Sequence, residues 1–226
     1  MKGLPAALAL LFALAGAAQA QTAESADQLI ARWTASDTTC RNPSASAVDA
    51  VGACEQRDTL AKVLALAGFC HASAAGRSGP AWTRCTNRGQ QESTRATAQF
   101  QRMGGVFALS ARLNGGTQVY FIVDSGAATV QIPEEAVEEM KRNGTLTEAD
   151  FMGQHRFILA DGRTMQQRVF RLRTLQIGDR TMENVLATMG APKSRALLGQ
   201  SFLRRLNWWK IDNVRNAIEF EFTGAF

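Results

Sequence analysis

The second half of the chain is patterned as short apolar runs separated by turn residues. Residues 119–123 are apolar without interruption, and residues 218–222 alternate between apolar and acidic side chains. Uninterrupted runs of this length are typical of buried strands, and alternation is typical of strands with one buried face. The pattern therefore predicts a mainly β, barrel-like domain over residues 104–226.

Turn residues divide this half into further elements. The Asp-Gly pair at residues 161–162 predicts a hairpin over residues 156–165, because that pair is the strongest short signal for a tight hairpin turn. Pro133, followed by two glutamates, predicts the start of a helix that ends at Asn143-Gly144. The remaining strands are expected in residues 106–113, 118–123, 165–177 and 184–189, with turns at residues 114–116, 178–179 and 213–216.

The first half of the chain has a different pattern. Residues 23–33 and 47–68 are rich in helix-forming side chains, and all four cysteines lie before residue 90. These features predict a small disulfide-linked α-helical module over residues 21–88. The residues that follow are rich in Arg, Gln, Ser and Thr without a clear period, so a linker is expected over residues 89–103.

The N-terminus has the organisation of an export signal. Residues 1–20 contain a basic start at Lys2, a short apolar stretch and the small-residue cleavage site Ala18-Gln19-Ala20. The mature chain is therefore expected to begin at Gln21, in the periplasm. An uncleaved membrane anchor is the alternative, and only then would the protein contact a membrane. Pro5 and the abundance of Ala leave the stretch short of the ~20 strongly apolar residues that a span needs.

Four cysteines in an exported chain favour two disulfides. If the second helix is unbroken, Cys54 and Cys70 lie ~24 Å apart along it and cannot bond. Two pairings stay open: Cys40 with Cys54 and Cys70 with Cys85, or the crossed arrangement. Zinc ligation is the alternative, and it is disfavoured because the spacings of 14, 16 and 15 residues contain no close Cys-Cys pair. No metal and no other cofactor is expected.

Composition and charge narrow the range of partners. With 226 residues, 46% of them hydrophobic and 20% charged, the chain has an ordinary globular composition. Its formal net charge is +5, with arginines scattered over both halves and no dense Lys/Arg run or interleaved aromatic residues. The sequence therefore gives no support for nucleic-acid binding.

One carboxylate lies in a distinctive context. Asp124 follows the apolar run 119–123, begins the tripeptide Asp124-Ser125-Gly126 and precedes a second strand-like stretch, residues 127–133. The tripeptide alone is weak evidence, because an Asp-(Ser or Thr)-Gly arises by chance in roughly one chain in ten of this size. About 70 residues later, the apolar segment Leu197-Leu198-Gly199 leads into a short amphipathic stretch. The two segments together are far more specific than either one.

Residues 104–222 resemble the retropepsin-like aspartic proteases, in particular their bacterial members. In that family an apolar-apolar-Asp-(Thr/Ser)-Gly-Ala loop supplies the catalytic aspartate, and an apolar-apolar-Gly segment near the C-terminus crosses behind it. Asp124-Ser125-Gly126-Ala127 and Leu197-Leu198-Gly199 match these two positions. The resemblance implies a single-lobe acid-protease barrel in which Asp124 is catalytic. It also implies that the expected hairpin is a flap over the substrate, with Ala160, Asp161 and Gly162 at its tip.

The resemblance gives roles to the neighbours of Asp124 as well. Ser125 corresponds to the hydroxyl residue that hydrogen-bonds across a dimer, and Gly126 allows close backbone approach. Ala127 occupies a position that is often Ser or Thr in pepsin-like members, where the hydroxyl stabilises the ionised carboxylate. Because Ala127 has no hydroxyl, a pH optimum nearer neutrality than that of a gastric-type enzyme is expected. The flap tip is expected to hold an extended peptide through backbone groups.

Peptide hydrolysis by carboxylates needs two of them close enough to share a proton. No second Asp-(Thr/Ser)-Gly occurs in the chain: Asp161-Gly162 lacks the middle hydroxyl, and neither Asp37-Thr38 nor Asp58-Thr59 is followed by glycine. The family's solution for a single lobe is a homodimer in which the two copies of Asp124 meet at the two-fold axis. The expected partners are therefore a second copy of this chain and a peptide or protein substrate.

Other classes of hydrolase lack support. The motifs Gly-x-Ser-x-Gly and His-Glu-x-x-His are both absent, and only His71 and His155 are available to a serine hydrolase. The alternative function is non-catalytic: a periplasmic peptide-binding or dimerisation module that keeps the fold without turnover. Three roles stay open for the N-terminal module: a partner-binding domain, an inhibitory prosegment or a spacer.

Overall fold

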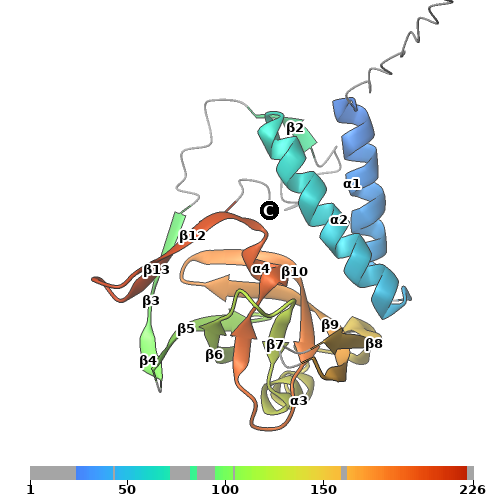
Figure 1. Ribbon diagram of the computed structural model, residues 1–226. Helices are drawn as coiled ribbons and strands as arrows, with labels where there is room; N and C mark the ends of the chain where they lie inside the picture. The colour runs from blue at the N-terminus through green and yellow to red at the C-terminus, as the bar shows by residue number, and fades with distance from the viewer. Residues whose placement is uncertain are drawn as a thin grey trace, which may run out of the picture.

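The computed structural model describes residues 24–42, 44–71, 82–85, 95–103, 105–158 and 162–222. The expected signal peptide, the expected start at Gln21 and the flap-tip residues Ala160 and Asp161 lie outside the described residues. A pair of helices lies at one end of a larger β domain, on the side where strands β8, β9 and β10 run (Figure 1). The fold is mainly β, as the apolar pattern predicts.

In the described residues, eight strands form one sheet in the order β4-β5-β6-β11-β7-β10-β9-β8. A further pairing of β5 with β9 closes this sheet into a barrel-like unit. Two pairings are parallel, β6 with β11 and β7 with β10, and both bring together segments that are distant in the sequence. The strands are β4 (Gln101–Met103), β5 (Val106–Leu113), β6 (Thr117–Val123), β7 (Val130–Ile132), β8 (Phe151–Ile158), β9 (Thr164–Ile177), β10 (Arg180–Met189) and β11 (Ala196–Leu198).

A second sheet in the described part of the chain joins β12 (Leu206–Asp212), β13 (Ala217–Phe222) and β3 (Arg95–Gln99). The strands pair in antiparallel fashion, with Phe220 opposite Ala96. Residues 95–103, which fall in the range expected as a linker, therefore form β3 and β4. Their order comes from pairing with β5 and with β13, which lies about 120 residues further along the chain.

One hydrophobic core unites the two sheets. The largest fully buried side chains include those of Phe121, Phe170, Phe202 and Phe220, which come from β6, β9, α4 (Gln200–Leu203) and β13. Because Phe202 packs edge-on against Phe220 at 6.0 Å, the short helix α4 is fixed between the barrel and the second sheet. This helix directly follows Gly199, so the core also fixes the backbone behind Asp124.

The local signals in the β domain are largely confirmed. The predicted turns at residues 114–116, 178–179 and 213–216 connect β5 to β6, β9 to β10 and β12 to β13. Helix α3 (Glu134–Arg142) begins one residue after Pro133 and ends just before Asn143. A single 3-10 turn, η1 (Glu148–Asp150), then leads into β8.

The N-terminal module contains helices α1 (Ala26–Arg41) and α2 (Ala47–Leu66), which lie side by side (Figure 1), and a short hairpin of β1 (Phe69–His71) and β2 (Trp82–Arg84). One disulfide, Cys40–Cys54, connects the two helices, and the other, Cys70–Cys85, connects β1 to the residue directly after β2. Of the two pairings that the sequence left open, the uncrossed one is confirmed. Two disulfides are typical of proteins in an oxidising, exported location. Among the described helices, none combines the length and the apolar character that a bilayer span requires.

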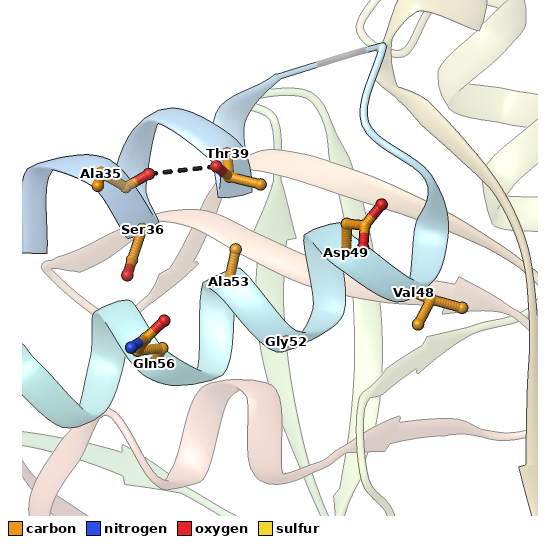
Figure 2. A pocket seen from close by; sticks show the side chains of 8 residues that line it. All are labelled: Ala35, Ser36, Thr39, Val48, Asp49, Gly52, Ala53 and Gln56. Carbon is orange, nitrogen blue, oxygen red and sulfur yellow. Dashed lines mark hydrogen bonds between the residues drawn. The ribbon is translucent and has the colours of Figure 1, made fainter. Parts of the chain in front are cut away.

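A hollow of about 480 Å³ lies between α1 and α2, lined by small and polar side chains from both helices (Figure 2). Two of its polar groups make hydrogen bonds within the module. Thr39 donates to the carbonyl oxygen of Ala35, and Asp49 accepts a hydrogen bond from Ser46 at the start of α2.

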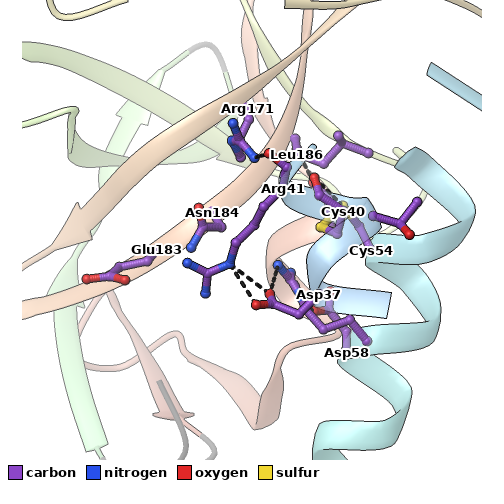
Figure 3. The surroundings of a disulfide bond; sticks show 12 residues. Asp37, Cys40, Arg41, Cys54, Asp58, Arg171, Glu183, Asn184 and Leu186 are labelled. Carbon is purple, nitrogen blue, oxygen red and sulfur yellow. Dashed lines mark hydrogen bonds and ion pairs between the residues drawn. A yellow bond between two sulfur atoms is a disulfide. The ribbon is translucent and has the colours of Figure 1, made fainter. Parts of the chain in front are cut away.

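The helices join the barrel through a second, smaller apolar cluster. Ala50 and the Cys40–Cys54 disulfide pack against Val169 of β9 and Leu186 of β10. Beside the disulfide, Arg171 of β9 donates a hydrogen bond to the carbonyl oxygen of Arg41, at the end of α1 (Figure 3). The module and the barrel thus share buried surface.

Buried charges cross the same junction. The carboxylate of Asp58, on α2, lies 2.7 Å from the guanidinium of Arg57 and 3.6 Å from that of Arg205, and all three side chains are at most 5% exposed. Arg205 also donates to the carbonyl oxygens of Glu183 and Asn184, at 2.7 and 3.3 Å. Burial lowers the pKa of Arg205 to about 9, and the negative charge of Asp58 opposes that shift. Arg205 is therefore still charged at neutral pH.

Candidate active site

Asp124 lies directly after the C-terminal end of β6, the strand with the uninterrupted apolar run. Its backbone N–H donates to the carbonyl oxygen of Leu198 at 3.2 Å, which extends the parallel ladder between β6 and β11 by one residue. Both strands are anchored in the core, through Phe121 on β6 and Leu198 on β11, each 0% exposed. The side chain of Asp124 itself is only partly buried. A buried framework therefore presents a carboxylate that a second molecule can reach.

A tight turn holds this carboxylate in place. The backbone N–H of Gly126 donates to Asp124 Oδ1 at 2.9 Å, and the N–H of Ala127 donates to the carbonyl oxygen of Asp124 at 3.3 Å. The first bond fixes the orientation of the carboxylate relative to its own backbone, as aspartates at turns commonly do. Ser125 and Gly126, at the tip of the turn, are exposed.

The segment Leu197-Leu198-Gly199 passes close to this turn. A Cβ atom placed on Gly199 would lie 2.2 Å from the carbonyl oxygen of Thr129 and 2.7 Å from that of Ala127. No real Cβ tolerates such distances, so only glycine allows the two backbones to approach this closely. The structure thus brings the two sequence motifs into direct contact.

The start of helix α4 is hydrogen-bonded to the loop that carries Asp124. The N–H of Gln200 donates to Ala127 O at 2.8 Å, and the N–H of Ser201 donates to Ala128 O at 3.2 Å. The side-chain amide of Gln200 donates to Ser125 O at 2.7 Å. The loop that carries Asp124 is therefore held by three hydrogen bonds from the start of one short helix.

Sequence reasoning missed the roles of Gln200 and Ser201. The buried hydroxyl of Ser201 donates to Leu186 O at 2.6 Å and accepts from the N–H of Val130 at 2.8 Å, which connects β10, β7 and α4. Nearby, the hydroxyls of Thr129 and Thr188 lie 3.1 Å apart. Their position directly after Leu197-Leu198-Gly199 could have indicated that both residues lie near Asp124. Their hydrogen-bond partners are backbone atoms, which no sequence pattern identifies.

The expected flap hairpin is formed by β8 and β9. Its strands pair up to Ile158, opposite Thr164, and Gly162 adopts a left-handed φ of +82°. Close to the tip, the apolar side chains of Ile158 and Met165 are 78% and 39% exposed. Of the three predicted tip residues, the structure describes only Gly162.

A pocket of about 220 Å³ lies near Asp124, and the side chains of Ile122 and Arg195 contribute to its lining. Ile122 is paired with Leu197 of β11 and with Ala108 of β5, so these three side chains lie on one face of the sheet. By alternation along the chain, Asp124 is on that same face. No ion pair among the described residues includes Asp124.

Residues 109–205 match a protein-family model described as gag-polyprotein putative aspartyl protease. The match begins in β5, contains the Asp124 loop and ends after α4. Among solved structures, a retropepsin-like aspartic protease from Rickettsia conorii is similar at 19% identity, over 57% of this chain and 90% of that chain, with a TM-score of 0.40. No curated protein sequence matches the chain.

Proposed function

Because residues 109–205 match the aspartyl protease family model, we propose that the protein is an aspartic endopeptidase that acts as a homodimer. The single observation that carries the proposal is the carboxylate of Asp124, fixed by the N–H of Gly126 at 2.9 Å and by the backbone bond to Leu198, yet open to solvent. A rigid and accessible carboxylate is what a catalytic acid or base requires.

The chemistry requires a second carboxylate, and the proposal takes it from Asp124 of a second copy. Two carboxyl groups in contact cannot both ionise, so the pair holds one proton between them. The ionised member takes a proton from a water molecule, whose oxygen attacks the peptide carbonyl carbon. The protonated member donates to the carbonyl oxygen. The protonated carboxyl group then donates to the former amide nitrogen while the ionised one takes a proton from a hydroxyl of the gem-diol, and the C–N bond breaks to give a carboxylic acid and an amine.

The loop residues have supporting roles in this proposal. Ser125 and Gly126 are exposed at the tip of the turn, where a second copy would approach. The bond from Gln200 to Ser125 O keeps the tip from moving when the two loops meet. Ala127 offers no hydroxyl to the carboxylate. Leu197, Leu198 and Gly199 support the loop. Leu198 is fully buried and therefore does not contact substrate.

The substrate in this proposal is an extended peptide. The β8–β9 hairpin presents Ile158 and Met165 with large exposed fractions, and a peptide bound beneath it would bury them. Backbone groups of Ala160, Asp161 and Gly162 would pair with the substrate as a strand pairs with a neighbour. The reaction needs no cofactor. The disulfides fit a periplasmic protein exported through cleavage after residue 20.

The test compares wild type, Asp124→Asn and Asp179→Asn on a library of unmodified peptides, with cleavage followed by mass spectrometry. We expect Asp124→Asn to lower kcat/KM by at least about 100-fold, because it removes the acid–base group. Asp179→Asn is the matched control, since its side chain is 78% exposed at the β9–β10 turn, and it should retain full activity.

Sedimentation tests the assembly independently. Wild-type protein should shift from monomer towards dimer when pepstatin, a mimic of the transition state, is added, and Asp124→Asn should shift less. Peptide binding without any cleavage by wild type would favour the non-catalytic alternative. Cleavage by protein that stays strictly monomeric would contradict the dimeric mechanism.

A further inference from the structure

The pocket near Asp124 has apolar walls and a single positive charge. Its walls include Met103, Ala108, Tyr120, Ile122 and Pro133, and among the described residues that line it Arg195 alone is charged. Several wall residues are partly open to solvent, with Met103 48% and Tyr120 43% exposed. At about 220 Å³, the pocket is smaller than a typical site for a whole small molecule and matches a single side chain.

The position of the pocket relates it to the proposed reaction. Ile122 precedes Asp124 by two residues and lies on the same face of the sheet, so the pocket begins about 7 Å from the carboxylate along β6. Side chains on one face of an extended peptide recur at the same spacing of about 7 Å. A peptide that runs along β6 with its scissile carbonyl at Asp124 would therefore place one side chain, within two residues of the cleaved bond, at this pocket.

The backbone of Arg195 is fixed beside the pocket. Its carbonyl oxygen accepts a hydrogen bond from the side-chain amide of Gln131, on β7, at 3.3 Å. Gln131 accepts in turn from the amide of Gln167, on β9, at 3.0 Å. The next residue, Ala196, is already in β11. The Arg195 side chain thus extends from an anchored backbone. Because Arg195 and Leu197 are two residues apart, their side chains lie on the same face of the sheet.

The guanidinium of Arg195 is available for a ligand. The side chain is exposed, and within the described residues it has no ion-pair or hydrogen-bond partner. Two other barrel arginines, Arg168 and Arg173, lie 3.0 and 3.3 Å from carboxylates of the chain.

We infer that this pocket, the Arg195 pocket, selects substrates with a carboxylate side chain next to the cleaved bond, and that glutamate is preferred to aspartate. The apolar walls bury the methylene groups of glutamate, and Arg195 pairs with its carboxylate in a bidentate, charge-assisted contact. The shorter aspartate side chain buries less apolar surface at the same site. The inference rests on the proposed function and specifies the substrate class that the same site takes.

The experiment uses peptides that are identical except for Glu, Gln, Asp or Lys at each position within two residues of the cleaved bond. For wild type we expect kcat/KM to be about 10-fold higher with Glu than with Gln at one of these positions, and lowest with Lys. Arg195→Glu should reverse the order, so that Lys exceeds Glu. Arg112→Glu, which changes an exposed arginine of β5 outside the pocket lining, should keep the wild-type order.

Binding separates this inference from the proposed function. The affinities of the same peptides for Asp124→Asn are measured by fluorescence anisotropy, and the Glu peptide should bind about 10-fold more tightly than the Gln peptide. Cleavage or binding that is equal for Glu, Gln and Lys would overturn the inference and leave the protease proposal intact. The inference would also be overturned if Arg195→Glu and Arg112→Glu changed the ratio of kcat/KM for the Glu peptide to kcat/KM for the Gln peptide by the same factor. Binding with a Glu preference but no cleavage by wild type would reject the protease proposal alone.

Discussion

The backbone of Gly199 passes so close to Thr129 that a Cβ atom on Gly199 would lie 2.2 Å from the carbonyl oxygen of Thr129. The atoms in the way are all backbone atoms of the active-site loop, so they cannot be moved by a simple change of side-chain rotamer. The φ angle of Gly199, −95°, is accessible to any residue. The requirement for glycine at this position is therefore one of space and not of backbone conformation.

Gly199→Ala should consequently displace the loop that carries Asp124. We expect a loss of about 1–3 kcal/mol in the free energy of unfolding, as for other overpacked sites, together with a fall in kcat. Urea unfolding followed by tryptophan fluorescence measures the first quantity, and peptide cleavage measures the second.

A matched glycine on α2 provides the control. A Cβ atom on Gly52 would meet nothing within 4 Å, and Gly52 lies within a helix. Gly52→Ala should therefore raise the free energy of unfolding by about 0.5–1 kcal/mol and leave kcat unchanged. A Gly199→Ala protein as stable and as active as wild type would contradict the close approach described above.

Asp58 and Arg205 give the second prediction. Asp58→Ala removes the carboxylate that faces two buried guanidiniums, those of Arg57 and Arg205, which are 5% and 4% exposed. We expect the free energy of unfolding to fall by about 3–5 kcal/mol, because an uncompensated buried charge is strongly destabilising. Chemical denaturation at pH 7 is the measurement.

The double variant Asp58→Ala/Arg205→Met tests the cause. Removing Arg205 together with Asp58 should restore part of the lost stability, since only one of the two guanidiniums that face Asp58, that of Arg57, then remains buried without it. The single variant Arg205→Met completes the cycle. If the losses in the free energy of unfolding of Asp58→Ala and Arg205→Met add up to the loss of the double variant, the two side chains do not interact. Because α2 supplies Asp58 and the barrel supplies Arg205, the same cycle measures how tightly the helical module is attached.

The elements that the sequence predicts well are those with local causes. The turn at Gly178-Asp179 and the end of α3 at Asn143 follow from residues within a few positions of one another. The apolar run of β6 is typical of a buried strand, but the strand alternates between buried and exposed positions, with Tyr120 43% exposed. The contact between the Asp124 loop and Gly199 was predicted from a resemblance, because no local pattern relates residues about 70 positions apart.

The elements that the sequence does not predict depend on distant partners. Residues 95–99 have no apolar run, and they form a strand only because β13 offers an edge about 120 residues later. Helix α2 buries Arg57 and Asp58, which a pattern of apolar positions assigns to solvent. Their burial depends on Arg205, on a different domain, and so is visible only in three dimensions.

Ala127 gives a prediction for the pH dependence of catalysis. In wild type no hydroxyl at position 127 stabilises the ionised carboxylate, so the optimum of kcat/KM should lie above pH ~3. Ala127→Ser adds such a donor and should move the acid limb of the profile to lower pH by about one unit. Profiles from pH 2 to 8 measure both effects. A wild-type optimum below pH ~3, or a shift to higher pH in Ala127→Ser, would contradict the role given to this position.

His71 gives a prediction for the pH dependence of stability. Its ring lies 4.7 Å from that of Trp33 and 5.0 Å from that of Trp82, in the small core of the N-terminal module. Burial lowers the pKa of His71 below 6.5, the negative charge of Asp37 opposes this shift, and the positive charges of Arg41 and Arg57 add to it. The neutral imidazole is thus favoured in the folded state.

The sign of the effect follows from proton counts. Between the lowered pKa of the folded state and 6.5, the unfolded chain binds more protons than the folded one, so stability rises with pH. As pH falls below 6.5, the free energy of unfolding should therefore decrease, with a slope of at most about 1.4 kcal/mol per pH unit from this group. His71→Phe keeps a ring between Trp33 and Trp82 and removes the titration. Urea unfolding from pH 7.5 to 5 should give curves that diverge below pH 6.5, with wild type losing more stability than His71→Phe; parallel curves would exclude His71 as the cause.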